Sequence, residues 1–222
     1  DLEERDQRSV TFDAIVVGSG QAGVPLATRL GRGDTRVLLV ERGALGGTCV
    51  NTGCTPNRTS AEGVYAVGDC AGGPQFTHAA WDDHRLLFDV LAGRPGRGRK
   101  DRIVPYTVYT DPQISGVGLT ERAAKERGVA YEVASLPYGK VARAIETDET
   151  AGLLKILIDP RTERILGASI VGAEAGELIH VFVALMAAGA PARAVVDMEA
   201  VHPSFAEGVQ SVVMALPRFA SS

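Results

Sequence analysis

Two cysteines, Cys49 and Cys54, are the residues of this sequence with the clearest potential for redox chemistry. Neighbouring thiols in a cytosolic protein indicate catalysis or metal binding. In a straight helix their Cα atoms would be about 8 to 9 Å apart, whereas a disulfide needs roughly 4.4 to 6.8 Å. A redox pair would therefore straddle a loop and a distorted helix start, which Gly53 would help to allow. Two unpaired buried thiols are the alternative, and a metal site is disfavoured because no second Cys or His pair lies nearby at zinc-like spacing.

A single G-x-G-x-x-G motif is formed by Gly18, Ser19, Gly20, Gln21, Ala22 and Gly23. The first glycine of such a motif permits a tight turn, the second lets a pyrophosphate approach the backbone, and the third lets the helix pack on the strand. The diphosphate then lies at the helix N-terminus. Glu41 follows about 20 residues later, where a carboxylate can accept hydrogen bonds from a ribose. The pattern predicts dinucleotide binding without saying which dinucleotide, and a structural glycine turn is the alternative.

The elements around this motif form a predicted βαβ unit. Residues 12–17 and 35–41 are short apolar, β-branched runs, and residues 21–31 between them have helix-forming composition. Continuous apolar character predicts strands buried on both faces, as in a parallel sheet. Residues 63–69 are a third candidate strand, and residues 76–91 a following amphipathic helix. The expected core positions of that helix are Trp81, Leu86, Leu87 and Val90.

A Gly/Pro-rich stretch, residues 92–101, breaks every periodic pattern and is the predicted domain boundary. The basic cluster at residues 94–102 is interpreted as a solvated linker. Beyond it we predict an antiparallel sheet with helices packed on it, an α+β arrangement. The expected strands are residues 103–110, 131–138 and a hairpin at 152–172 that turns at Asp159-Pro160; the expected helices are 120–127, capped by Thr120 and followed by Gly128, then 174–188, 191–198 and 203–216.

Composition excludes several classes of function. A net charge of -4 over 222 residues gives no reason to expect nucleic acid, because phosphate binding needs a basic face. No apolar run approaches the roughly 18 to 20 residues that a bilayer crossing requires, so no membrane association is expected. Three cysteines are too few for a secreted disulfide scaffold, and the charged first ten residues lack the apolar core of a secretory signal. A cytoplasmic protein is the expectation.

Three segments resemble the flavin-dependent pyridine nucleotide-disulfide oxidoreductases. The stretch GGTCVNTGCTP, residues 46–56, resembles their redox-disulfide motif, most closely that of the mercuric reductase-like and dihydrolipoamide dehydrogenase-like branch. Residues 63–93 resemble the second flavin motif, and residues 103–216, which include HPSFAE, resemble the dimerisation domain. The resemblance implies an α/β fold: a partial Rossmann-like FAD-binding domain with a parallel sheet at residues 1–93, its two segments joined near 56–60, followed by an α+β dimerisation domain at 101–222.

Roles for the thiols and their proton shuttle follow from the resemblance. It implies that Cys49 exchanges with a small thiol or disulfide substrate and that Cys54 lies next to the flavin. His202 would be the acid/base, oriented by Glu207 and supplied by the other subunit of a homodimer. Such a shuttle is physically reasonable, because the thiolate is the reactive form and a histidine titrates near neutral pH. Without the resemblance, His202-Pro203 would be interpreted as a helix start with proline at its first position.

The resemblance also implies an FAD site. Asp69 would hold the ribityl chain or the pyrophosphate, while the residues that begin the helix at 76–91 would lie near the isoalloxazine. No metal site is implied. The implied cofactor-binding residues are Gly18, Ser19, Gly20, Gln21, Ala22, Gly23, Glu41, Arg42, Gly47, Thr48, Asp69, Phe76, Thr77 and His78. We expect Cys70 to pack beside the second flavin motif, His84 to be an exposed helix residue and His180 to be an ordinary residue of a helix face.

The sequence departs from the family pattern in one large respect. The family has a second dinucleotide-binding domain for NAD(P)H, and here only one G-x-G-x-x-G exists. Arg58 stands near the position of a family lysine and is not assigned its role. The expected function is FAD-dependent dithiol/disulfide oxidoreduction, with NAD(P)H as electron donor only where the missing domain is present. The alternatives are a catalytically dead truncated homodimer module and a flavin-free dithiol protein; mercuric reduction is disfavoured because the C-terminus has no cysteine pair.

Overall fold

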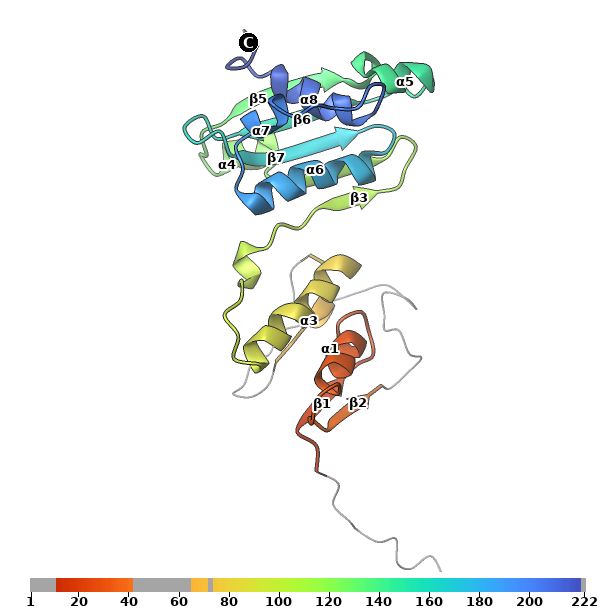
Figure 1. Ribbon diagram of the computed structural model, residues 1–222, viewed down its shortest axis with the longest axis vertical. Helices are drawn as coiled ribbons and strands as arrows, with labels where there is room; N and C mark the ends of the chain where they lie inside the picture. Colours follow the sequence, from red (N-terminus) through yellow and green to blue (C-terminus); the bar gives the residue numbers. More distant parts are fainter. Residues whose placement is uncertain (1–10, 42–64, 72–73, 221–222) are drawn as a thin grey trace, which may run out of the picture. The chain divides into compact units, whose positions relative to one another are not determined.

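The computed structural model describes residues 11–41, 65–71 and 74–220 (Figure 1). The chain divides into two compact units, Asp1–Arg102 and Ile103–Ser222, which we call unit 1 and unit 2 and describe separately. Unit 1 carries the glycine-rich motif and unit 2 carries His202. None of the described helices is both long enough and apolar enough to cross a membrane.

Unit 1 begins with the predicted βαβ unit. Strand β1 (Ala14–Val17) pairs in parallel with β2 (Val37–Val40), and helix α1 (Gly23–Leu30) connects them. The parallel sheet is therefore confirmed. Burial on both faces is wrong for β1, since Ile15 is 62% exposed and Val17 is 80% exposed. The physical reason is that the described sheet has two strands only, and α1 covers one of its faces.

The third predicted strand is not a strand where the structure describes it. Residues 65–67 are irregular, and a 3-10 turn, η1 (Gly68–Ala71), follows. Gly68 has a φ of +73° and donates its backbone N–H to Oδ2 of Asp83 at 2.7 Å. The prediction was wrong because an extended strand needs a neighbouring strand to accept its N–H groups, and here a side chain on the next helix takes that place.

Helix α3 (Thr77–Leu91) forms as predicted but buries a different face. Trp81 and Val90, expected in the core, are 46% and 61% exposed, while Leu86 and Leu87 are half-buried. The buried residues are instead Ala79, Ala80, Asp82, Asp83 and His84. The expectation that His84 is exposed is therefore wrong. The face changes because α3 packs on α1 and η1 with its small residues, and distant arginines pair with its carboxylates.

Those arginines come from the segment predicted to be a solvated linker. Arg97 pairs with Asp82, whereas Arg99 and Arg102 pair with Asp83. The short turn η2 (Arg99–Asp101) lies in the same segment, and the side chain of Arg102 is only 7% exposed. Arg97 and Arg99 are each 44% exposed, which agrees with the solvated interpretation. That interpretation is wrong for Arg102, because the carboxylates of α3 hold its side chain in a buried position.

Unit 2 contains one antiparallel sheet with the strand order β3-β4-β7-β6-β5. The predicted hairpin is present, and Oδ1 of Asp159 accepts hydrogen bonds from the N–H groups of Arg161 and Thr162 in its turn. Strand β4 was not predicted, because its two glycines weaken its strand propensity. The strands are β3 (Tyr106–Val108), β4 (Ile114–Gly118), β5 (Glu132–Pro137), β6 (Leu153–Ile158) and β7 (Ile165–Val171).

The helices of unit 2 largely follow the predicted order. Thr120 caps α4 by accepting a hydrogen bond from the N–H of Ala123 at 3.1 Å, and Gly128 follows with a φ of +63°. Two short elements, η3 (Tyr138–Lys140) and α5 (Ala142–Glu146), were not predicted. The remaining helices are α4 (Glu121–Glu126), α6 (Ala175–Ala188), α7 (Arg193–Val196) and α8 (Ala206–Met214).

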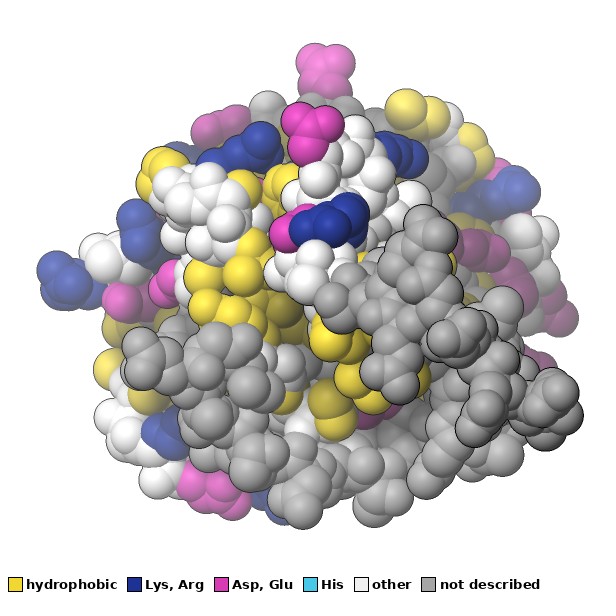
Figure 2. Space-filling view, turned by 90° about the horizontal axis from the view of Figure 1, so that it is seen from below, with side chains coloured by type: hydrophobic (Ala, Val, Ile, Leu, Met, Phe, Trp, Pro, Cys, Tyr) yellow, Lys and Arg dark blue, Asp and Glu magenta, His cyan; other side chains and the backbone are white. Residues whose placement is uncertain are grey.

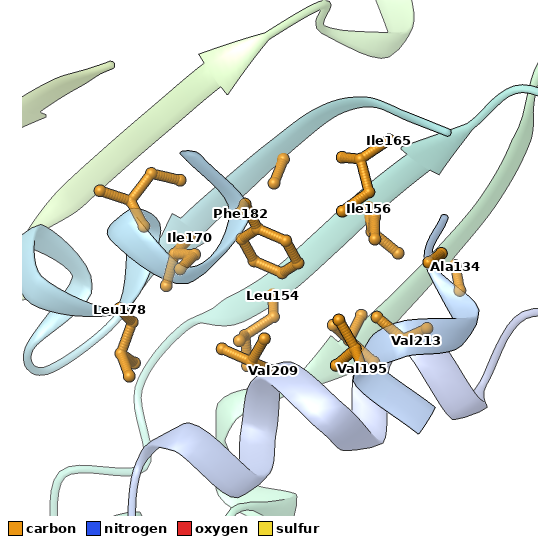
Figure 3. Close-up of a cluster of buried hydrophobic side chains, with 14 of the residues drawn as sticks. Ala134, Leu154, Ile156, Ile165, Ile170, Leu178, Phe182, Val195, Val209 and Val213 are labelled. Carbon is orange, nitrogen blue, oxygen red and sulfur yellow. The ribbon is translucent and has the colours of Figure 1, made fainter. Parts of the chain in front are cut away.

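The core of unit 2 lies between this sheet and the helices α6, α7 and α8 (Figures 1 and 3). Phe182 on α6 has no exposed surface and lies among sheet side chains such as Leu154, Ile156 and Ile170 (Figure 3). Val209 and Val213 of α8 close the same cluster. Burying one such side chain stabilises a fold by about 1.5 to 3 kcal/mol, so this cluster fixes the helices on the sheet.

The described part of unit 1 exposes many large apolar side chains. Hydrophobic side chains are open on the face shown in Figure 2. Exposed apolar side chains that gather on one face favour association with other chains. The large exposed apolar residues of unit 1 are Phe12, Ile15, Val17, Val24, Val40, Tyr65, Phe76, Trp81, Val90 and Leu91.

Candidate functional site

The glycine-rich motif forms the loop between β1 and α1. Gly18 has a φ of +99°, and its N–H donates to the carbonyl of Val40 at 2.7 Å. A methyl group built on Gly18 would meet no atom within 4 Å, so the backbone there borders open space. At Gly23 the same methyl would lie 1.9 Å from the carbonyl oxygen of Gly18. Only glycine therefore allows α1 to start this close to the loop.

Glu41 closes this loop from the end of β2. Its Oε2 accepts hydrogen bonds from the backbone N–H of Ser19 at 2.7 Å and from the Ser19 hydroxyl at 2.8 Å. Ser19 is only 1% exposed. Because the carboxyl ends of parallel strands meet at one edge of the sheet, β1 and β2 deliver the loop and the carboxylate to the same place. Glu41, which the sequence predicts to bind a ribose, therefore also holds the glycine-rich loop through two hydrogen bonds.

These residues fit a dinucleotide. The N-cap residue of α1 is Ala22, which makes no side-chain cap hydrogen bond, so no cap of this residue occupies the helix N-terminus where a diphosphate would lie. Open space borders Gly18, and a carboxylate stands at the end of the next strand. Loop, helix N-terminus and acidic residue are the three parts that a dinucleotide site of this type needs.

The segment that carries Asp69 lies beside the loop. Asp69 is the second residue of η1, and a methyl group built on Gly68 would lie 3.6 Å from the Cβ atoms of Ala22 and Ala80. Ala22 belongs to the glycine-rich loop, so the structure brings the loop and η1 together. Asp83, which accepts a hydrogen bond from the N–H of Gly68, was not predicted as a site residue. The available signal was the pair of adjacent acidic residues on a helix followed by a basic run.

The other predicted flavin residues of unit 1 lie at the start of α3. Phe76 is the N-cap residue, and Thr77 is the first helical residue. The rings of Phe76 and His78 stack with their centroids 5.2 Å apart and an angle of 11° between their planes. Phe76 is 37% exposed, so an apolar ring surface is available at this end of α3.

Unit 2 carries a polar pair at the start of α8. Nδ1 of His202 and Oε1 of Glu207 are 2.8 Å apart, and Oε2 of Glu207 accepts a hydrogen bond from the N–H of Ser204, also at 2.8 Å. The His202 side chain is 73% exposed. Helix α8 begins at Ala206, so the alternative that Pro203 is its first residue is wrong. The structure thus holds an exposed imidazole by one of its two nitrogens.

The pKa values of His202 and Glu207 are both shifted in this pair. The hydrogen bond to Glu207, followed by its negative charge, raises the pKa of His202 above the ordinary value. The N–H of Ser204, followed by the hydrogen bond to His202, lowers the pKa of Glu207. An imidazole with this orientation can accept and return a proton near neutral pH while Glu207 fixes its tautomer.

Five predicted site residues lie outside the described part of the chain: Cys49, Cys54, Arg42, Gly47 and Thr48. Their roles stay predictions. Cys70, expected to pack beside the second flavin motif, is exposed, and its Sγ lies 3.2 Å from the carbonyl oxygen of Val67 in that motif. Within residues 11–41, 65–71 and 74–220, no group of three or more His, Cys, Asp or Glu side chains could hold a metal ion.

Two family models match this chain. Residues 104–213 match the dimerisation domain of the pyridine nucleotide-disulphide oxidoreductases. Residues 12–59, which include the glycine-rich loop and the two cysteines Cys49 and Cys54, match the pyridine nucleotide-disulphide oxidoreductase model itself. The match at residues 12–59 falls in unit 1, and the match at residues 104–213 falls in unit 2.

Individual relatives agree with these matches. The probable pyridine nucleotide-disulfide oxidoreductase RclA of Escherichia coli is 34% identical over 93% of this chain and 45% of its own length. The dihydrolipoyl dehydrogenase of Trypanosoma brucei brucei is 37% identical over 91% of this chain and 41% of its own length. Among solved structures, the HOCl-induced flavoprotein disulfide reductase RclA from Escherichia coli aligns with a TM-score of 0.65 and 33% identity, covering 79% of this chain and 44% of that one. The chain spans less than half the length of the curated relatives it matches.

Proposed function

This chain belongs to the pyridine nucleotide-disulphide oxidoreductase family, and from that premise we propose that it serves FAD-dependent dithiol/disulfide oxidoreduction. The observation that carries the proposal is the pair of His202 and Glu207, with 2.8 Å between Nδ1 and Oε1. A glycine-rich loop alone supports any dinucleotide. An exposed, oriented imidazole in the unit that matches the dimerisation domain supports thiol chemistry, because each exchange step moves a proton as well as electrons.

Unit 1 would hold the cofactor. The loop from Gly18 to Gly23 and the N-terminus of α1 would hold the pyrophosphate, Glu41 a ribose, and Asp69 the ribityl chain or pyrophosphate. FAD, when bound, supplies the two-electron transfer chemistry, and the protein supplies position and electrostatics. The apolar ring of Phe76 and the neighbouring residues Thr77 and His78 would lie near the isoalloxazine.

The thiol step can be written with balanced electrons and protons. In the reduced pair, the Cys49 thiolate attacks one sulfur of a small disulfide substrate, and the released substrate thiolate takes a proton from the His202 imidazolium. The Cys54 thiol loses its proton to His202 and attacks Cys49. The second substrate thiolate leaves and takes that proton from His202, and the Cys49–Cys54 disulfide forms. The substrate gains two electrons from the cysteine pair and two protons, one from the Cys54 thiol and one from the His202 imidazolium.

We further propose a homodimer built through unit 2. Residues 104–213 match a dimerisation domain, and an exposed His202 is suited to serve the thiols of a second copy. NAD(P)H would be the electron donor through a second dinucleotide-binding domain. The 222-residue chain contains one G-x-G-x-x-G motif, so we expect this polypeptide alone to be reduced by dithionite but not by NADH.

The test begins with the visible spectrum of the purified chain after incubation with FAD and removal of free flavin. Near-stoichiometric flavin supports the proposal. Reduced protein is then mixed with a small aromatic disulfide, and thiol release is followed for the wild type, Cys49→Ser, Cys54→Ser and the control Cys70→Ser. Cys49→Ser should abolish release, Cys54→Ser should stop after one thiol with the other substrate half held in a mixed disulfide, and Cys70→Ser should release two thiols as the wild type does.

Two other outcomes would identify the alternatives. Exchange through Cys49 and Cys54 without flavin binding would indicate a flavin-free dithiol protein. Neither flavin nor exchange, in a dimeric protein, would indicate a catalytically dead module. Rapid reduction of bound flavin by NADH in the 222-residue chain would contradict the expectation about the donor.

A further inference from the structure

Asp83 connects α3 to the turn that carries Asp69. Its Oδ2 accepts a hydrogen bond from the backbone N–H of Gly68 at 2.7 Å, and its side chain is only 4% exposed. Gly68 adopts a φ of +73°, which is the left-handed region that favours glycine. The bond therefore fixes the backbone at the residue immediately before Asp69.

Two arginines complete this anchor. A terminal guanidinium nitrogen of Arg102 lies 2.8 Å from Oδ1 of Asp83, and Nε of Arg99 lies 3.3 Å from the same oxygen. Arg99 also donates to the carbonyl of Ala71, the last residue of η1, at 3.3 Å. A buried carboxylate is costly unless it is paired and hydrogen-bonded, and these arginines supply the opposite charge. Asp83 thus holds one end of the turn, and Arg99 holds the other.

The anchored turn lies against the glycine-rich loop. A methyl group on Gly68 would contact both Ala22 of the loop and Ala80 of α3 at 3.6 Å, which is ordinary van der Waals distance. The turn is therefore seated between two packed surfaces, and its backbone position depends on the hydrogen bond that Asp83 accepts. A change at Asp83 would therefore reach Asp69 through the backbone of Gly68.

We propose that Asp83, supported by Arg99 and Arg102, is a positioning residue that fixes the 68–71 turn and so places Asp69 beside the dinucleotide loop. The effect on cofactor binding rests on the FAD-dependent function proposed above. The hold on the turn itself does not, because the contacts involve only this chain. The two parts can therefore be tested separately.

The first experiment uses the full 222-residue chain without FAD. The hydrogen-exchange rate of the Gly68 amide is measured by NMR in the wild type, Asp83→Ala, Asp83→Asn and Asp82→Ala. Asp82 is the matched control, because it is also buried and its described partners are Arg85, Arg97 and Arg102. Loss of a hydrogen bond to a charged group should speed exchange about tenfold or more in Asp83→Ala. Asp83→Asn keeps an acceptor oxygen and should recover most of the protection, whereas Asp82→Ala should change it less.

The second experiment titrates the same proteins with FAD and follows flavin fluorescence. We expect Asp83→Ala to raise the Kd about tenfold and Asp83→Asn to restore most of the affinity. If the wild type binds no FAD, the function proposed above fails, and the exchange rate of Gly68 still decides whether Asp83 holds the turn. Equal effects of Asp83→Ala and Asp82→Ala on exchange would overturn the positioning role.

A further pair of variants applies if Asp83→Ala does not fold, as judged by circular dichroism. Arg99 and Arg97 are each 44% exposed and each pairs with one of the two carboxylates, but only Arg99 reaches Ala71. Arg99→Met should speed exchange of the amides in the 68–71 turn and weaken FAD binding more than Arg97→Met does. The same effect from both variants would contradict the proposal.

Discussion

The backbone N–H and the hydroxyl of Ser19 both donate to one oxygen of Glu41, at 2.7 and 2.8 Å, across 22 residues of sequence. The carboxylate at the end of β2 therefore fixes the shape of the glycine-rich loop in the chain without a ligand. A preorganised loop binds its ligand more tightly, because less conformational entropy is lost on binding.

Ser19→Ala removes one of these two hydrogen bonds. We expect the free energy of unfolding to fall by about 1 to 2 kcal/mol, because the acceptor is charged and Ser19 is buried. FAD affinity should fall with it. Urea unfolding and FAD titration of Ser19→Ala, Glu41→Gln and the double variant form a thermodynamic cycle. If the losses of unfolding free energy in the two single variants add up to the loss in the double variant, Ser19 and Glu41 do not stabilise the loop through their mutual hydrogen bonds.

Gly23→Ala should disrupt the loop. The added methyl would lie 1.9 Å from the carbonyl oxygen of Gly18, a backbone atom that cannot rotate away. We expect a loss of about 3 kcal/mol or more in the stability of unit 1. The single tryptophan, Trp81, lies on α3 and reports the unfolding of unit 1 by fluorescence.

Gly33→Ala is the matched control for that change. A methyl group at Gly33 meets no atom within 4 Å, and Gly33 does not have a positive φ. Its stability should stay equal to that of the wild type or rise by about 0.4 to 1 kcal/mol, as for Gly to Ala changes at compatible sites. Equal losses in the two variants would show that the close approach at Gly23 is not the cause.

Glu207→Gln should lower the pKa of His202. Glu207 raises that pKa above 6.5 in the wild type, through a hydrogen bond and its charge. An NMR titration of the imidazole protons should show the pKa of His202 moving down toward 6.5 in the variant. The pKa of His84, which is lowered by burial, should not change. An unchanged His202 midpoint would show that Glu207 does not control this group.

The same pair predicts how stability depends on pH. Because the pKa of His202 is raised, its contribution to the free energy of unfolding is complete below pH 6.5 and is lost as the pH rises through the pKa of the folded state. Because the pKa of Glu207 is lowered, its contribution to the free energy of unfolding is complete above pH 4.5 and is lost as the pH falls through the pKa of the folded state. The pair therefore stabilises most fully between these limits, and the difference in melting temperature between wild type and Glu207→Gln should be largest there.

Phe182→Ala should destabilise unit 2. The ring is fully buried against the sheet (Figure 3), and removing such a side chain leaves a cavity that costs about 3 to 5 kcal/mol. Ile145→Ala is the control, since Ile145 is 58% exposed and its loss should cost about 0.5 kcal/mol or less. Urea unfolding followed by circular dichroism measures both.

The predicted elements succeeded where the local pattern was strong. The hairpin of β6 and β7 has strands rich in Leu, Ile and Val on each side of Asp159, and α4 has both a capping threonine and a terminal glycine. Strand β4 was not predicted, because Gly116 and Gly118 lower the strand propensity of this segment. Gly116 is required there by its neighbour, since a methyl group would lie 2.7 Å from the ring of Tyr106 on β3.

The site predictions divide in the same way. The position of the loop from Gly18 to Gly23 and the acidic residue after β2 could be predicted, because spacing along a βαβ unit is fixed by the lengths of its elements. The burial of Asp83 could not be predicted from α3 alone. Helical periodicity favoured Trp81 and Val90, and the outcome depended on arginines that follow the helix in a segment without periodicity.

The sequence by itself determined the family, the glycine-rich loop, the histidine with its glutamate, and the order of most strands and helices. These features depend on residue type and short-range spacing, which the chain carries along its length. Only the tertiary structure decided that Glu41 clips Ser19, that Asp83 holds the turn before Asp69, and that one face of β1 is exposed. Such contacts join segments 15 or more residues apart, and a donor there has many possible acceptors until packing brings one of them within hydrogen-bonding distance.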